Sequence, residues 1–157
     1  MLLKTYEFNK VYHYDLSDWI RIDGWTKEGV RELMVDGRFA SHILERQIPK
    51  WHPALAHVKG CKDHDHVDEG LGGIRFDAKN LTKNGCRYMP SNMIGEGRVF
   101  DKQIFHEKAK NMNYIICDIV DYPKVRLIFK SGPDLLKLFP KGVISKGKGR
   151  KELFDGE

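Results

Sequence analysis

One short stretch of the chain, residues 63–92, contains the side chains best suited to phosphodiester chemistry. It begins with the run Asp63-His64-Asp65-His66, and it later contains Asn80 and Asn92. A histidine can take a proton from water near neutral pH, and carboxylate or amide oxygens can hold Mg²⁺ against a phosphate. Glycines between these residues allow the backbone to approach a phosphate closely. The spacing therefore predicts phosphodiester hydrolysis.

The alternation of acids and histidines leaves several roles open. In a strand, His64 and His66 would share one face of the sheet, while Asp63 and Asp65 would lie on the other. Either face could provide a proton acceptor or metal ligands. The elements that must position these groups therefore decide which role is possible.

Before this stretch, hydrophobic periodicity predicts two helices that pack on a core. Residues 27–36 and 38–48 carry apolar side chains at helical spacing, with an interruption near Gly37 and a stop at Pro49. Residues 55–61 predict a strand that leads into the Asp-His run. Gly70, Gly72 and Gly73 then predict a loop.

After this stretch, the pattern predicts a helix, a hairpin and a second helix. Residues 100–109 have helical spacing, and residues 114–120 and 124–129 read as two strands around the turn Asp121-Tyr122-Pro123. Pro133 is suited to the first turn of a helix that ends before Pro140. Residues 141–157 predict a flexible basic tail.

The composition fits one globular domain. The 157 residues are 41% hydrophobic and 31% charged, and no apolar run approaches the roughly 18 residues of a membrane span. We expect no signal peptide, a cytoplasmic location and no membrane partner. Three widely spaced cysteines predict free thiols. The net charge of +5 suits a polyanionic partner.

These motifs resemble those of the His-Me finger nucleases, also called ββα-metal or HNH-like nucleases. Similar members carry an Asp-x-x-His strand, a Gly-Gly loop, an Asn-Leu pair and an asparagine on the next helix. The matching motifs here are Asp63-x-x-His66, Gly72-Gly73, Asn80-Leu81 and Asn92. The resemblance implies an α+β domain in residues 1–140. Its ββα-metal core would lie in residues 55–130, with flanking helices and a C-terminal β-hairpin.

The resemblance also implies a role for each residue of the site. His66 would be the general base, with His64 as a secondary catalytic group, and one Mg²⁺ or Mn²⁺ ion would be held by Asp63 with Asn80 or Asn92. The phage endonuclease VII group favours Asn80, which lies 14 positions after His66. Non-specific DNA/RNA endonucleases favour Asn92. The expected substrate is DNA, with RNA as the alternative.

Several basic side chains are expected to contact the phosphates of the substrate. Arg75 is expected to act within the catalytic group. Arginines can clamp a phosphate through two hydrogen bonds. The residues expected to bind nucleic acid are Arg87, Arg98, Lys146, Lys148 and Arg150.

A second interpretation uses different residues of the same stretch. Asp77-Ala78-Lys79 resembles the D-x-K motif of the PD-(D/E)XK nucleases. The upstream carboxylate would be Asp68 or Asp65, and Glu45 on the preceding helix would be a further ligand. Two carboxylates would hold Mg²⁺, and Lys79 would orient and activate the attacking water.

A third interpretation is a nucleic-acid-binding protein without catalytic activity. Its support is the segment 141–151, which has five basic residues spaced by glycines and no acidic residue. Such a segment can follow a phosphate backbone while it stays flexible. Measuring hydrolysis with and without Mg²⁺ separates this class from both nuclease interpretations.

Overall fold

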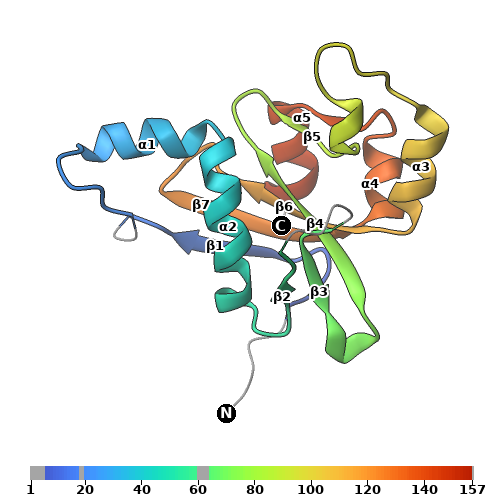
Figure 1. Ribbon diagram of the computed structural model, residues 1–157, viewed down its shortest axis with the longest axis horizontal. Helices are drawn as coiled ribbons and strands as arrows, with labels where there is room; N and C mark the ends of the chain where they lie inside the picture. Colours follow the sequence, from blue (N-terminus) through green and yellow to red (C-terminus); the bar gives the residue numbers. More distant parts are fainter. Residues whose placement is uncertain (1–5, 18–19, 60–63, 157) are drawn as a thin grey trace.

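The computed structural model describes residues 6–17, 20–59 and 64–156. These residues form one α+β domain with helices on both faces of a central sheet (Figure 1). The strands of that sheet are β1 (Val11–Asp15), β2 (Ala56–His57), β3 (His66–Asp68), β4 (Ile74–Leu81), β6 (Asn113–Asp118) and β7 (Lys124–Ser131). Their order is β1-β7-β6-β4-β3-β2. Strands β4 and β6 are parallel, and the other neighbours are antiparallel.

Helices α1 (Lys27–Val35) and α2 (Arg38–Trp51) cover one face of the sheet. Thr26 begins α1, because its hydroxyl accepts a hydrogen bond from the amide of Gly29 at 3.0 Å. Between the helices Gly37 has φ 93°, a conformation that favours glycine and lets the chain turn. The structure confirms the two helices expected here. Helix α2 runs past Pro49 to Trp51.

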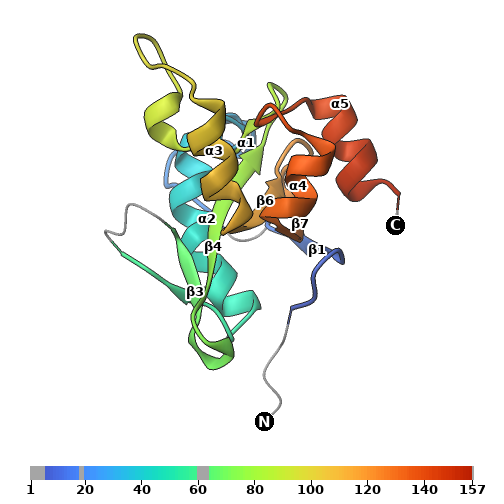
Figure 2. The same ribbon diagram turned by 90° about the vertical axis from the view of Figure 1, so that its right-hand side faces the viewer.

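Helices α3 (Lys102–Lys110) and α4 (Gly132–Leu138) cover the opposite face (Figure 2). Strand β7 leads directly into α4, where the hydroxyl of Ser131 accepts a hydrogen bond from the amide of Asp134. A side chain at Gly132 would collide with the main-chain oxygen of Ala109 on α3. Glycine therefore allows the close approach between the two helices.

The central hairpin forms as the sequence predicted, with β6 and β7 paired from Asn113–Ser131 to Asp118–Arg126. The helix expected from Pro133 is α4. The strand expected over residues 55–61 is shorter, because within the described residues it consists of Ala56 and His57 alone.

The glycine-rich segment is the turn of a β-hairpin. Strands β3 and β4 pair antiparallel, with a 3₁₀ turn at Glu69–Leu71, and Gly72 and Gly73 follow with positive φ angles of 77° and 81°. Beyond this hairpin the structure does not confirm a ββα core. Strand β5 (Cys86–Arg87) and the 3₁₀ turn Ser91–Met93 lie between β4 and α3.

The C-terminal segment differs from the flexible tail that the sequence suggested. It forms β8 (Val143–Ile144), α5 (Lys146–Gly149) and a π-helical turn at Arg150–Phe154. Strand β8 pairs with β5, and the side chains of Ile144 and Phe154 are fully buried. The domain therefore continues beyond residue 140, because these apolar side chains complete its core.

Candidate active site

His66, the expected general base, lies inside the protein. Its side chain is on β3 and is 0% exposed, and its Nε2 lies 2.7 Å from the main-chain oxygen of Glu45. Pro49 lacks the amide that would bond to this oxygen four residues earlier in α2. A carbonyl can only accept, so Nε2 of His66 donates in place of the missing amide. This contact gives His66 a structural role.

Burial lowers the pKa of His66 to about 4, and the charge of His57 adds to the decrease. The hydrogen bond to Glu45 acts in the opposite direction. The imidazole is therefore neutral near pH 7, but a general base must also lie within reach of the water from which it takes a proton. The burial of His66 does not suit that task in this conformation.

The other residues of the histidine-based site lie in different surroundings. Asn80 donates to the main-chain oxygen of Gly37 at 3.0 Å and to the hydroxyl of Ser41 at 2.9 Å, so it fastens β4 to the start of α2. Asn92 is exposed on the turn after β5. His64 is partly buried, whereas Asp63 lies outside the described residues. Within the residues described, no three His, Cys, Asp or Glu side chains form a group that could hold a metal ion.

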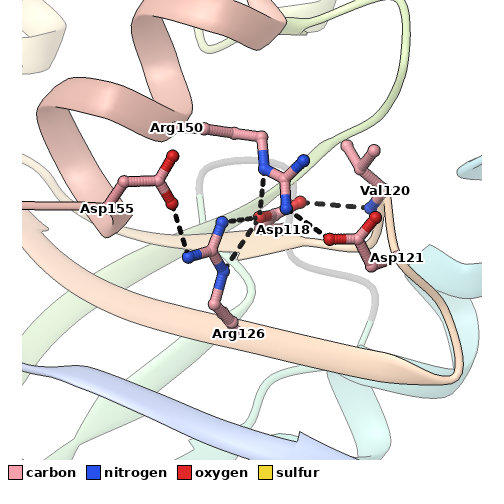
Figure 3. Close-up of polar contacts among 6 residues, drawn as sticks. All are labelled: Asp118, Val120, Asp121, Arg126, Arg150 and Asp155. Carbon is pink, nitrogen blue, oxygen red and sulfur yellow. Dashed lines mark hydrogen bonds and ion pairs between the residues drawn. The ribbon is translucent and has the colours of Figure 1, made fainter.

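The basic residues expected to bind nucleic acid fall into two groups. Those that are exposed are Arg75, Arg87, Arg98, Lys146 and Lys148. Arg150 instead joins a charge network (Figure 3), in which it contacts Asp118 and Asp121. Arg126 binds Asp118 at 2.6 Å and Asp155 at 2.7 Å in the same network. Arg150 therefore fixes the C-terminal turn to the sheet.

Two carboxyl groups of the D-x-K interpretation meet at the start of the β3–β4 hairpin. Asp65 lies just before β3, and its Oδ2 accepts a hydrogen bond from the amide of Ala78 at 2.9 Å. By the register of β3 and β4, Asp65 lies opposite Asp77 on β4, and its carboxyl group acts on that of Asp77. Burial raises the pKa of Asp77 to about 6, and the neighbouring Asp65 contributes to the increase. The two acids thus share a confined space.

Lys79 completes this arrangement on the same face of β4. It follows Asp77 by two residues, so both side chains point to the side of the sheet that carries α3. Its Nζ lies 3.4 Å from Asp77 Oδ2, with exposed fractions of 20% and 15% for the two side chains. The positive charges of Lys79 and of Lys108 on α3 lower the pKa of Asp77 and partly offset its burial.

Of the two candidates for the upstream carboxylate, Asp65 lies beside Asp77, whereas Asp68 is engaged elsewhere. Asp68 is 3% exposed and accepts a hydrogen bond from the hydroxyl of Tyr6 at 2.8 Å. Glu45, the further acid of this interpretation, lies on α2 with its Oε2 3.5 Å from Nε2 of His57. Helix α2 covers the face of the sheet opposite to that of Asp77 and Lys79, so the structure does not bring Glu45 to this pair.

The paired acids have the chemistry of a small metal site. Mg²⁺ in proteins commonly binds one or two carboxylates and fills its remaining positions with water and substrate phosphate. A divalent cation between Asp65 and Asp77 would favour the ionised form of both carboxylates. The residues present therefore fit such an ion. Asp65 and Asp77 would be its protein ligands, and a substrate phosphate would be a further ligand.

The sequence contained a signal for this site, but it was a weak one. A three-residue D-x-K pattern is common, and only the pairing of β3 with β4 brings Asp65 next to Asp77. A different feature of the sequence, Pro49, indicates the structural role of His66. Proline at position 49 leaves the carbonyl of Glu45 without its helical donor, so a buried side-chain donor was required nearby.

Comparison with models of protein families, with curated proteins and with solved structures finds no match to this chain. No helix within the described residues is long and apolar enough to cross a membrane.

Proposed function

We propose that this protein is a metal-dependent endonuclease that uses the D-x-K residues of β4. Asp65 and Asp77 would hold Mg²⁺ or Mn²⁺, and Lys79 would orient and activate the attacking water. DNA or RNA would be the substrate. The observation that carries the proposal is the placement of Asp65 opposite Asp77 across the β3–β4 pairing, with the ammonium group of Lys79 3.4 Å from Asp77 Oδ2.

Two further features support this choice over the histidine-based mechanism. Asp77 and Lys79 are partly exposed, whereas His66 is fully buried and bonded to a main-chain oxygen. The net charge of +5 favours a polyanionic substrate. Because Asp65 directly precedes β3 and its carboxylate accepts a hydrogen bond from the amide of Ala78 on β4, the pairing of these strands positions both carboxylates.

Each side chain has a distinct part in the proposed hydrolysis. The bound ion supplies stabilisation of the negative charge that develops on the phosphate. Asp65 and Asp77 fix its position, and Lys79 donates hydrogen bonds that orient water for attack on phosphorus. A new P–O bond forms as the bond to the leaving oxygen breaks. The proton lost by the water ends on the leaving oxygen, which yields a phosphate monoester and a hydroxyl.

A cleavage assay on plasmid DNA, single-stranded DNA and RNA tests the proposal. Cleavage should require Mg²⁺ or Mn²⁺, stop with EDTA and fall about 100-fold or more in Asp77→Asn. Asp134→Asn is a matched control on α4. Full activity in EDTA, or an unchanged rate in folded Asp77→Asn, would contradict the proposal. Binding without any cleavage would identify a non-catalytic nucleic-acid-binding protein.

A further inference from the structure

A basic groove lies on the α3 side of the molecule. Its volume is about 510 Å³, which is within the roughly 300–1,000 Å³ range of ligand sites. The side chains that define it here are Arg87, Met89, Met93, Phe100, Lys102 and Lys141. Three of these are cationic, and none of the residues found to line it is acidic. We name this feature the β5–α3 groove.

The same region presents apolar side chains to solvent. Of the six large hydrophobic residues that are exposed within the described part of the chain, four are located here. They are Val99, Phe100, Ile104 and Val143, with exposed fractions of 81%, 40%, 57% and 49%. Cations beside exposed apolar groups favour a ligand that carries both negative charge and flat apolar faces.

Phe100 is held in place from beneath. Its ring centroid lies 5.7 Å from that of Phe105, which is fully buried and itself makes an edge contact with Tyr88 at 5.2 Å. Phe100 therefore packs in part against this core while 40% of its surface is exposed. An exposed aromatic ring with a packing contact is suited to stacking against a base.

The β5–α3 groove shares its elements with the candidate active site. Helix α3 carries Lys102 in the groove and, about 9 Å further along its axis, Lys108, whose charge acts on Asp77. Strand β5 carries Arg87 in the groove. The neighbouring residue on this strand is Cys86, and the charges of Lys79 and Asp77 act on the pKa of its thiol. The segment that contains Phe100 leads into α3 (Figure 2). A strand of nucleic acid in the groove would thus approach the carboxylate pair.

We propose that the β5–α3 groove binds single-stranded nucleic acid, with one base stacked on Phe100 and backbone phosphates on Arg87, Lys102 and Lys141. The choice of nucleic acid as the ligand rests on the proposed function and names its substrate class. The bases of a duplex are stacked on one another, so an intact duplex offers no base face to Phe100. Single strands, or frayed and looped segments, are therefore the expected substrates.

Binding of a fluorescein-labelled 20-nucleotide oligodeoxythymidine, measured by anisotropy in EDTA, tests the inference without cleavage. The wild type should bind this strand more tightly than a 20-base-pair duplex. Phe100→Leu should weaken binding roughly 5- to 100-fold, whereas Phe100→Trp should retain it. Lys102→Gln should lower the slope of log affinity against log salt by about 0.7. Trp25→Leu and Lys27→Gln are matched controls and should bind like the wild type.

Several outcomes would overturn the inference. These are unchanged binding in folded Phe100→Leu, tighter binding to the duplex, or Phe100-dependent binding to anionic phospholipid vesicles in place of the oligonucleotide. The result is separable from the proposed function. Strand binding that follows the expected pattern without cleavage would refute the nuclease alone. Metal-dependent cleavage that is indifferent to Phe100 and Lys102 would refute the groove alone.

Discussion

Asp65 lies opposite Asp77 across the β3–β4 hairpin, and its carboxyl group contributes to the raised pKa of Asp77. Ionisation of Asp77 is unfavourable in this partly buried position next to another acid. A divalent cation would offset the negative charge there. The same pair of acids therefore links the folding stability of the protein to pH and to metal binding.

Asp77→Asn should stabilise the metal-free protein above pH 6. The pKa of Asp77 rises from 3.8 to about 6 on folding, so ionisation opposes folding as pH increases through this window. At pH 4 the variant and the wild type should unfold at similar temperatures. Above pH 6 the variant should be more stable by about 2–3 kcal/mol, given about 1.4 kcal/mol per pKa unit. Thermal unfolding in EDTA from pH 4 to 8 measures this, and an equal difference at all pH values would count against the carboxyl pair.

Mg²⁺ should raise the unfolding temperature of the wild type above pH 6. A ligand that binds the folded state alone stabilises it in proportion to the logarithm of its concentration. Asp65→Asn and Asp77→Asn should each lose most of this increase, while Asp134→Asn keeps it. Replacing Mg²⁺ with Na⁺ at equal ionic strength controls for screening. An increase that survives in both variants would place the metal elsewhere.

Lys79→Ala should separate metal binding from catalysis. The variant keeps both carboxylates, so Mg²⁺ should still stabilise it, whereas the loss of the ammonium group should lower kcat by roughly 10²- to 10⁴-fold. Lys83→Ala, at an exposed position just after β4, is the control. Single-turnover cleavage with saturating substrate measures the chemical step. Near-normal kcat in folded Lys79→Ala would exclude the role proposed for this lysine.

The sequence predicted the hairpin β6–β7 because its apolar side chains are hardly interrupted. It did not predict β4 as a full strand. Phe76 and Leu81 are its buried apolar side chains, and the polar residues Asp77, Lys79 and Asn80 between them interrupt the apolar pattern. Polar residues at these positions belong to the candidate site or anchor α2. Local rules of this kind fail most often where residues serve a function.

The histidine-rich run attracted a catalytic interpretation because sequence does not reveal burial. His66 has the residue type and the neighbours of a general base, but pairing with β4 and α2 places it in the interior. The C-terminal segment posed the opposite problem. Its glycines and lysines suggested disorder, although Ile144, Leu153 and Phe154 are buried between them. In both segments, tertiary contacts that the sequence pattern does not show place side chains in the interior.

His66→Gln should fold and retain cleavage within a few-fold of the wild type, because the glutamine amide can donate to the carbonyl of Glu45 in place of Nε2. The folded-state pKa of about 4 lies below the unfolded value of 6.5, so His66 costs stability as pH falls through this window. Between pH 6.5 and 4, the free energy of unfolding of His66→Gln should therefore fall by up to about 3 kcal/mol less than that of the wild type. Chemical unfolding at each pH measures this.

His66→Leu is the informative comparison, since it leaves the Glu45 carbonyl without a donor. It should unfold more easily by about 1–3 kcal/mol. A loss of roughly 10²-fold or more in cleavage by folded His66→Gln would instead restore the histidine to the role of general base.

Phe154→Ala should test whether the C-terminal segment is part of the folded domain. The ring is 0% exposed, and the guanidinium carbon of Arg126 lies 4.9 Å from its centroid. Removing a buried phenylalanine side chain typically costs about 3–5 kcal/mol, because apolar contacts are lost and a cavity remains. Glu152→Ala, exposed on the same turn, should change stability by less than about 0.5 kcal/mol. Urea unfolding of both variants measures the contrast. A flexible tail would make the two substitutions equally harmless, whereas a packed segment makes Phe154 alone costly.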